Sequence, residues 1–278
     1  MFWISKRKQR DLDRERNSER NRAYIEGYSA GYKNGKSDGL TMRITPNQIR
    51  FAYGLPEIDT AEREEKQMKV IIRHYADHWQ IIKDNALFTI HKFGGGQYPT
   101  TDWKKKILIA EHSPIRSGRL IVEVHDVPSF VIGHFVRHNQ GFVPFVSSLR
   151  YDRTEYENGK VPDRNTPNGL RFDGNFQSFI NISRKRYCGQ ASKETRDVWN
   201  AIMSAVAEYE PELYFVCVPE CVYRGGCSES FGMCEGQVWR KFFENLNTKG
   251  LIETTFISIP KRYEEWHRFK NKNFDEVK

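Results

Sequence analysis

Most of the predicted secondary structure is helical. Apolar residues that recur every three or four positions indicate a helix with one buried face. This spacing is present at 60–82, 129–138, 175–188, 192–211 and 237–247. In the first of these stretches His74 and His78 would lie one turn apart. We interpret them as ordinary helix residues, because no third metal ligand accompanies them.

Strands are predicted at only two places. Residues 120–124 form an apolar run in which Glu123 and then His125 are interleaved, and residues 251–259 resemble a second strand. Residues 152–168 are rich in Pro, Asn, Asp and Gly, which predicts a long loop. Because the helices outnumber the strands, and the strands are isolated along the chain, the pattern indicates an α+β fold.

The first 40 residues differ from the rest of the chain. After Ile4 they contain almost no aliphatic residues, and glycines recur every four positions beside tyrosines. Such a stretch cannot bury enough apolar surface to form a core. We therefore expect a polar N-terminal extension at 1–40 and one folded domain at 41–278.

The composition excludes a membrane-spanning protein. The chain has 278 residues, with 44 Lys and Arg against 36 Asp and Glu, a net charge of +8. Its mean hydropathy is −0.71, and no apolar run approaches the roughly 20 residues that a bilayer requires. Only residues 1–4 are apolar before Lys6, a segment too short for a secretory signal. We expect a cytoplasmic protein.

The basic residues form two groups with different meanings. Residues 5–20 mix Lys and Arg with acidic residues, which is typical of a solvated helix; nucleic acid is therefore not the favoured partner. The second group lies beside aromatic and apolar residues: Arg137, Arg150, Arg184, Lys185 and Arg186. A charge in such surroundings needs a partner, which is either an anionic small ligand or an internal salt bridge.

One candidate binding motif lies at the end of the predicted helix 129–138. His134, Arg137 and His138 are spaced i, i+3 and i+4, so they would share one helix face. Ser148 follows His138 by ten residues and Arg150 follows it by twelve. Two arginines and a hydroxyl suit a phosphate and the polar edge of a planar ring, because Arg presents its donors in a rigid fork.

A second motif lies on the predicted helix 175–188. Asn175, Asn181 and Arg186 would place amide and guanidinium donors along it. Asn lowers helix propensity in a helix interior, which favours a ligand at these positions. The alternative is a solvated surface with Arg186 in a salt bridge, and the sequence leaves both open.

Four segments follow one another in a characteristic order between about residues 107 and 186. They are Glu111-His112-Ser113-Pro114, the segment 128–138 (PSFVIGHFVRH), Ser148-Leu149-Arg150-Tyr151, and the segment 175–186. Their order resembles the flavin-dependent thymidylate synthase family. The order is more specific than any of the segments alone.

The resemblance implies an α+β fold with a central, mostly antiparallel sheet flanked by helices. It also implies an FAD-dependent methyltransferase that converts dUMP to dTMP. Methylenetetrahydrofolate would supply the one-carbon unit and NADPH would reduce the FAD, so the partners would be a nucleotide and a folate. Members of the family are homotetramers with active sites between subunits, and we expect the same here.

Carried over position by position, the resemblance also assigns individual residues. It gives catalytic roles to Arg137, His138 and Arg150. It places Ser148, Arg150, Arg186 and His134 at the nucleotide, and Arg137, His138, Asn175 and Asn181 at FAD. Two arginines of the family are Asn139 and Gln177 in this chain, so we expect altered flavin contacts, and a modified pyrimidine nucleotide is an alternative substrate.

The chain contains five cysteines, an odd number that fits reduced thiols or a metal site better than a disulfide framework. Cys217, Cys221, Cys227 and Cys234 could provide four thiolates for tetrahedral zinc. Their spacing is looser than that of paired Cys-x2-Cys motifs, and the family that the chain resembles supplies no metal site. We therefore favour reduced thiols and expect no metal.

A function from another class stays open. The same scaffold would suit a non-catalytic, basic protein that binds nucleic acid or serves in assembly. The colour of the purified protein distinguishes the two, because a yellow protein with flavin absorbance favours the enzyme.

Overall fold

The computed structural model describes residues 41–42, 68–93, 96–150, 161–230, 234 and 237–273. The chain divides into two compact units, Met1–Thr41 and Met42–Lys278. Only Thr41 of the first unit is described, so the N-terminal extension expected at 1–40 lies outside the described residues and stays a prediction.

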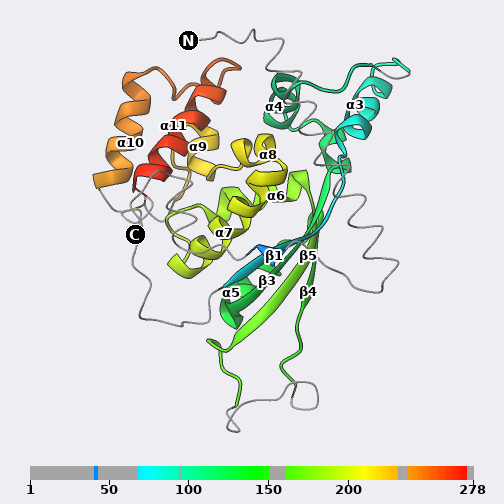
Figure 1. Cartoon of the computed structure of the whole chain (residues 1–278). Helices are drawn as coiled ribbons and strands as arrows, with labels where there is room; N and C mark the ends of the chain where they lie inside the picture. Colours follow the sequence, from blue (N-terminus) through cyan, green and yellow to red (C-terminus); the bar gives the residue numbers. More distant parts are fainter. Residues whose placement is uncertain are drawn as a thin grey trace, which may run out of the picture. The chain divides into compact units, whose positions relative to one another are not determined.

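In the described part of the second unit, four antiparallel strands form a central sheet (Figure 1). Their order across the sheet is β2 (Lys69–Tyr75), β3 (Arg119–Pro128), β5 (Pro167–Asn175) and β4 (Phe142–Val146). A two-residue strand, β1 (Thr41–Met42), precedes them in the chain. Leu120, Val122 and Val124 are buried on one face of β3, since alternate residues of a strand share a face.

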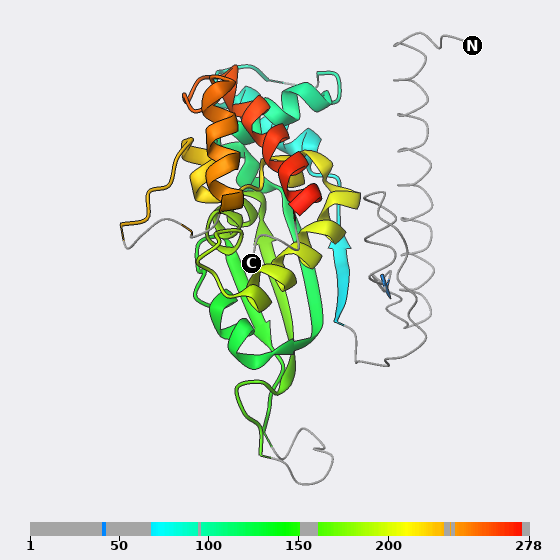
Figure 2. The same ribbon diagram turned by 90° about the vertical axis from the view of Figure 1, so that its left-hand side faces the viewer.

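The helices cover that buried face and one end of the sheet. They are α3 (Trp79–Phe88), α4 (Thr101–Ile109), the 3-10 helix η1 (Ser113–Ser117), α5 (Ser129–Phe135), α6 (Phe176–Arg186), α7 (Lys193–Tyr209), α8 (Pro211–Val216), α9 (Glu220–Arg224), α10 (Gln237–Thr248) and α11 (Ser258–Asn273). Figure 1 shows α6 to α11 on one side of the sheet, and Figure 2 shows α10 and α11 near one end of it. The α+β prediction, with an antiparallel sheet flanked by helices, is confirmed.

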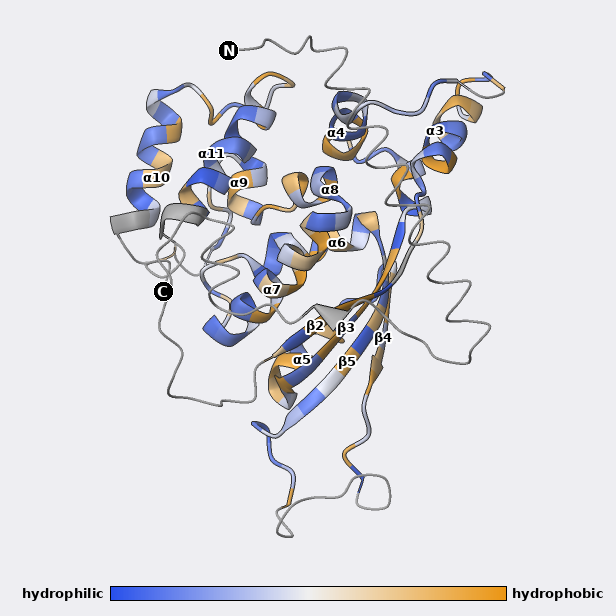
Figure 3. Cartoon of the chain, viewed as in Figure 1, coloured by the Kyte–Doolittle hydropathy of each residue, from blue (hydrophilic) through white to orange (hydrophobic). Residues whose placement is uncertain are grey.

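The amphipathic helices bury their apolar faces as their spacing predicts. In α7 the residues Val198, Trp199 and Ile202 are buried, and Figure 3 shows apolar and polar stretches of the same helix side by side. The helices predicted at 129–138, 175–188, 192–211 and 237–247 correspond to α5, α6, α7 and α10, and the strand predicted at 120–124 lies within β3. None of the helices among the described residues has the length and apolar character needed to cross a membrane.

The helix predicted at 60–82 is wrong over its described first part. Lys69–Tyr75 is strand β2, and α3 begins only at Trp79. Val70, Ile71 and Ile72 are all buried, and consecutive β-branched residues buried on both sides suit a strand. His74 is therefore in a strand and His78 precedes α3, so the two histidines do not lie one turn apart on a helix.

The strand predicted at 251–259 is also wrong, because α11 begins at Ser258. The guanidinium of Arg262 on α11 is fully buried and donates to the carbonyls of Leu251 at 2.8 Å, Ile252 at 3.2 Å and Glu253 at 3.1 Å. A buried carbonyl needs a hydrogen-bond donor, and here one side chain replaces the partner strand. The strand β5 was not predicted, and it begins at Pro167, within the last two residues of the loop predicted at 152–168.

Candidate functional site

A cluster of cationic and imidazole groups lies where α5 and α6 end. Helix α5 ends at Phe135, and a turn follows in which the backbone N–H of His138 donates to the carbonyl of Phe135 at 3.0 Å. His134 is in the last turn of the helix, whereas Arg137 and His138 lie beyond its end. The prediction that the three residues share one helix face is therefore wrong for Arg137 and His138. Arg186 nevertheless brings the end of α5 and the end of α6 together.

Arg186, the last residue of α6, connects these groups. Its Nε donates to Nε2 of His138 at 3.0 Å, and its terminal nitrogen donates to the carbonyl oxygen of His134. Nδ1 of His134 lies 2.8 Å from Oγ1 of Thr195 on α7. The cluster thus joins the end of α5, the end of α6 and the start of α7.

Helix α6 is held in place by its cap and its apolar face. The side chain of Asn175 accepts the backbone N–H of Ser178 at 2.9 Å, which makes Asn175 the N-cap of α6. Phe176 and Phe179 are fully buried. The sequence pattern suggested that Asn175 lies in a helix interior, but it precedes the helix as its cap. Capping explains the asparagine at this position without a ligand.

Burial and mutual repulsion control the charges in the cluster. Burial, with the cations Arg186 and Lys185, lowers the pKa of His138 to about 4. Burial also lowers the pKa of His134, and the positive charges of Arg186 and Arg137 lower it further. The pKa of Arg186 itself is lowered by burial and by Arg137. Neutral imidazoles thus lie beside guanidinium groups that repel each other, and an anion placed between them would relieve that repulsion.

Ser148 and Arg150 lie at the opposite end of β4 from this cluster. At the end of β4 near the cluster, Phe142 pairs with Gly174 of β5. At the end of β4 near Ser148 and Arg150, the N–H of Ser147 donates to the carbonyl of Gly169 at 3.0 Å. A five-residue strand is about 15 Å long. Within one chain the structure therefore does not bring Ser148 and Arg150 to Arg137, His138 and Arg186.

Asn181 lies on a different face of α6 from Arg186, in a polar network with Glu111. Nε2 of Gln177 donates to Glu111 at 2.6 Å and to Oδ1 of Asn181 at 3.2 Å. Arg184 forms an ion pair with Glu111 and covers the ring of Tyr223 at 3.7 Å. The spacing of 177, 181 and 184 places them on one face, and of the three only Asn181 was predicted to contact a ligand.

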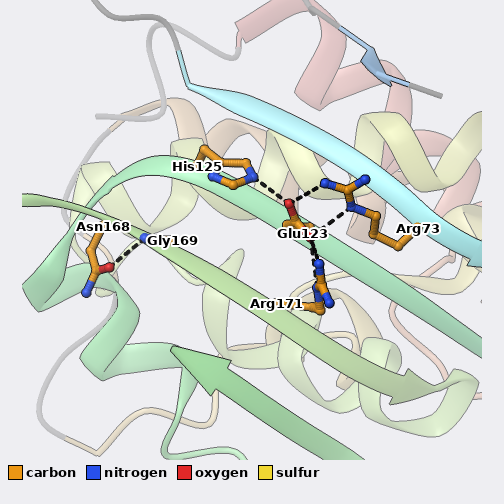
Figure 4. Close-up of polar contacts among 6 residues, drawn as sticks. All are labelled: Arg73, Glu123, His125, Asn168, Gly169 and Arg171. Atoms are coloured by element: carbon orange, nitrogen blue, oxygen red, sulfur yellow. Dashed lines mark hydrogen bonds and ion pairs between the residues drawn. The ribbon is translucent and has the colours of Figure 1, made fainter. Parts of the chain in front are cut away.

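A second missed cluster lies on the sheet, around the carboxylate of Glu123 (Figure 4). Arg73 on β2 donates to it at 2.7 and 2.8 Å, Arg171 on β5 donates at 2.8 Å, and Nε2 of His125 lies 2.6 Å away. Glu123 is only 5% exposed. Hydrogen bonds from Arg73, Arg171 and His125 lower its pKa to about 2. Close by, Oδ1 of Asn168 accepts the N–H of Gly169 at 2.7 Å.

The Glu123 cluster ties three strands together, and its one carboxylate already partners both arginines. Its sequence signal was the pair Glu123 and His125, interleaved in an apolar strand. The arginines on β2 and β5 give that pair its structural role, and the cluster at Arg186 is therefore the stronger candidate for binding an anion.

Comparison with known proteins gives matches among solved structures alone, since no family model and no curated protein matches the chain. Thymidylate synthase X (ThyX) from Helicobacter pylori, solved with FAD and dUMP, is 17% identical with a TM-score of 0.44, over 54% of this chain and 99% of that one. The UMP/dUMP methylase PolB from Streptomyces cacaoi, bound with 5-Br dUMP, is 13% identical with a TM-score of 0.43, over 54% and 94%. A second structure of the Helicobacter pylori enzyme, flavin dependent thymidylate synthase ThyX, is 16% identical. Two of these three structures are of ThyX, and the second is named as a flavin dependent thymidylate synthase, the family that the motif order resembles.

Proposed function

We propose that this protein transfers a one-carbon unit to C5 of a uracil nucleotide, converting dUMP to dTMP with FAD, NADPH and methylenetetrahydrofolate. The observation that carries the proposal is the cluster in which Arg186 joins His138 and the end of α5 beside Arg137. It combines fixed positive charge with a neutral imidazole in a half-buried position. That combination suits the phosphate or the polarised ring of a pyrimidine nucleotide.

The residues of the cluster would activate uracil without a nucleophile. Negative charge develops on the uracil ring as C5 becomes nucleophilic, and Arg186 and Arg137 would stabilise it electrostatically. Nε2 of His138 accepts a hydrogen bond from Arg186, which leaves Nδ1–H as the donor toward a ligand. FAD, when bound, supplies the hydride that completes the methyl group.

The cationic residues fit an FAD phosphate or ring better than the two asparagines do. We propose Arg137 and His138 as the main contacts. Oδ1 of Asn175 already caps α6 and Oδ1 of Asn181 already accepts from Gln177, so these residues would contribute to FAD through their amide groups. With Asn139 and Gln177 in place of arginines, we expect FAD to be held weakly.

Ser148 and Arg150 enter this proposal through a second subunit. They are separated from Arg186 by the length of β4, so a site containing both sets needs two chains. We therefore propose a homotetramer in which one subunit supplies His134, Arg137, His138 and Arg186 and another supplies Ser148 and Arg150. Light scattering measures the mass directly.

Calorimetry with dUMP tests the nucleotide site. Arg186→Ala and Arg150→Ala should each weaken dUMP binding by about 1.5 to 3 kcal/mol, the range of hydrogen bonds to charged groups. Lys185→Ala is the matched control, because Lys185 is an exposed cation next to Arg186 and should leave binding unchanged. If all three variants bind dUMP as the parent does, the nucleotide site lies elsewhere.

Quenching of flavin fluorescence tests the cofactor. FAD added to the folded protein should give saturable quenching, and Arg137→Ala should reduce the affinity. A folded, tetrameric protein that shows no quenching up to high micromolar FAD contradicts flavin dependence, even if dUMP binds.

A further inference from the structure

A cavity of about 440 Å³ is lined by residues of α4, α8 and α11. Helix α8 contacts both of the other helices, and Figure 1 shows it between them. Thr101, Glu264 and Arg268 line the cavity and are exposed, so it opens to solvent at these residues. Binding sites for small organic molecules have volumes of roughly 300 to 1,000 Å³, and this cavity falls within that range.

One wall of the cavity carries a buried carboxylate. Glu212 is the second residue of α8 and is only 6% exposed. Within the described part of the chain, no group donates a hydrogen bond to its carboxylate or forms an ion pair with it. A buried charge without a partner is costly. A cationic group of a ligand in the cavity would offset this cost.

A cation lines the same cavity from α4. Nζ of Lys105 lies 4.3 Å from the centroid of the Phe215 ring, and no carboxylate of the described residues forms an ion pair with it. Phe215 and Glu212 are three residues apart on α8, so they are neighbours on the helix surface. One small molecule could therefore contact both Lys105 and Glu212, which form no ion pair with each other.

Aromatic rings form the remaining wall. The ring of His267 on α11 stacks on that of Phe215, with centroids 6.0 Å apart and planes at 25°, and it lies 4.8 Å from the ring of Tyr214. Nε2 of His267 lies 2.9 Å from the carbonyl oxygen of Phe215. Burial, with the charges of Lys270 and Lys105, lowers the pKa of His267 to about 4. The wall is therefore uncharged at neutral pH and suits a flat, apolar group.

The charges at the mouth of the cavity already have partners. Arg268 pairs with Glu264 at 3.9 Å and with Glu265 at 2.8 Å. Among the described lining residues, the charges left for a ligand are thus the cation of Lys105 and the carboxylate of Glu212, beside the aromatic wall.

We propose that this cavity binds a small zwitterion, with one ammonium and one carboxylate on an aromatic body, as in a free aromatic amino acid. The ammonium donates to Glu212 and the carboxylate accepts from Lys105, and charge-assisted hydrogen bonds of this kind are strong. The aromatic side chain packs against Phe215 and His267. A ligand with a single charge leaves either Lys105 or Glu212 without a partner, which is the basis of the selectivity.

Calorimetry with three related probes tests the proposal. L-phenylalanine carries both charges, phenylethylamine lacks the carboxylate, and phenylpropionate lacks the ammonium. L-phenylalanine should bind at least about tenfold more tightly than either of the other two, because each of them loses one hydrogen bond between charged groups.

Two substitutions should change the selectivity in opposite ways. Glu212→Gln should weaken the binding of L-phenylalanine and phenylethylamine about tenfold or more without weakening that of phenylpropionate. Lys105→Met should weaken the binding of L-phenylalanine and phenylpropionate and spare that of phenylethylamine. Lys106→Met is the control, because Lys106 is exposed and pairs with Asp102; it should bind all three probes as the parent does.

Binding of the spared probe shows that each variant is folded. The proposal is overturned if no probe binds the parent at high millimolar concentration, as expected if Lys105 and Glu212 turn toward each other and pair. It is also overturned if a probe with one charge binds as tightly as L-phenylalanine, or if both substitutions weaken all three probes equally. Neither residue belongs to the cluster at Arg186, so dUMP binding should be the same in the parent and both variants, and failure here leaves the proposed reaction untouched.

Discussion

The Nε–H of Arg186 donates a hydrogen bond to Nε2 of His138 at 3.0 Å. A ring nitrogen that accepts cannot carry a proton, so His138 has its proton on Nδ1. Burial and the neighbouring guanidinium lower its pKa to about 4, and the imidazole is therefore neutral at physiological pH. The residues that motif order assigned to one binding site are thus coupled by a direct contact across 48 positions of sequence.

Removal of the Arg186 charge should raise the pKa of His138. In Arg186→Met the pKa should move from about 4 toward the usual 6.5 of histidine, and it should stop short of it because burial remains. An NMR titration of the histidine ring signals measures this. Lys185→Met is the control, since Lys185 is exposed and its smaller effect on His138 should be screened by solvent; equal shifts in the two variants would contradict the direct contact.

The parts of the fold that sequence predicts well are those with one buried face. In α6 and α7 a single apolar stripe faces the sheet, and the predicted ends agree with the observed ones within a few residues. The segment 69–75 was misassigned because Val70, Ile71 and Ile72 are apolar at every position, so a helix and a buried strand both accommodate them. No local pattern reveals that Arg262 satisfies the carbonyls of residues 251–253.

The candidate site was predictable only where its residues follow one another in motifs. Arg137, His138 and Arg186 come together as the order of motifs suggests. The four cysteines considered for zinc are close in the sequence, yet in the described part of the chain no three of them are arranged to hold a metal ion, and spacing along the sequence does not encode how their segments are placed. The same holds for Arg73, which reaches Glu123 from another strand, 50 residues away.

Glu123→Gln should destabilise the sheet. The substitution leaves Arg73 and Arg171 without their shared carboxylate, and we expect a loss of roughly 2 kcal/mol in the free energy of unfolding, because both arginines keep some contact with water. The pKa of Glu123 is lowered from 4.5 to about 2. Its stabilising contribution is therefore complete above pH 4.5 and is lost as the pH falls toward 2. Denaturant unfolding between pH 2 and 7 should show a flatter acid limb in the variant.

Asp173→Asn is the matched control for this prediction. Asp173 on β5 pairs with Arg119 on β3 at 2.8 Å, but these side chains are 29% and 49% exposed, far more than that of Glu123 at 7%. Exposed pairs contribute little, so we expect a change within about 0.5 kcal/mol. A loss as large as that of Glu123→Gln would mean that burial of Glu123 is not what matters.

Two glycine substitutions should act in opposite directions. Gly141 has a φ of +69°, and a Cβ there would lie 2.3 Å from Nδ2 of Asn175, the N-cap of α6. Gly141→Ala should cost about 2 kcal/mol, since it combines left-handed backbone strain with a disturbed cap. Gly133 lies within α5 with nothing within 4 Å of an added Cβ, so Gly133→Ala should stabilise by about 0.5 to 1 kcal/mol. Thermal unfolding compares the two, and destabilisation by both would contradict the packing around Gly133.

Lys270 should make the protein more stable as the pH rises from about 7 toward 10.5. The side chain is buried in α11, where its Nζ donates to the hydroxyl of Tyr187 at 3.1 Å and lies near the hydroxyl of Tyr214. Burial lowers its pKa from 10.5 to about 7, opposed in part by Cys217. Between these values the unfolded chain binds a proton that the folded one does not, so unfolding becomes harder with pH by up to about 1.4 kcal/mol per pH unit.

Lys270→Met should remove this dependence, because a thioether of similar length has no charge to bury. Below pH 7 the variant should be more stable than the parent, since the parent there bears the full cost of a buried ammonium. Toward pH 10 that advantage should vanish or reverse, because the neutral lysine keeps a hydrogen bond that methionine lacks. Denaturant unfolding at pH 6.5, 8 and 9.5 measures the difference, with Lys261→Met, at an exposed position of the same helix, as the control that should run parallel to the parent. If Lys270→Met also runs parallel to the parent, the amine of Lys270 reaches water in the folded protein and is not buried between the two tyrosines.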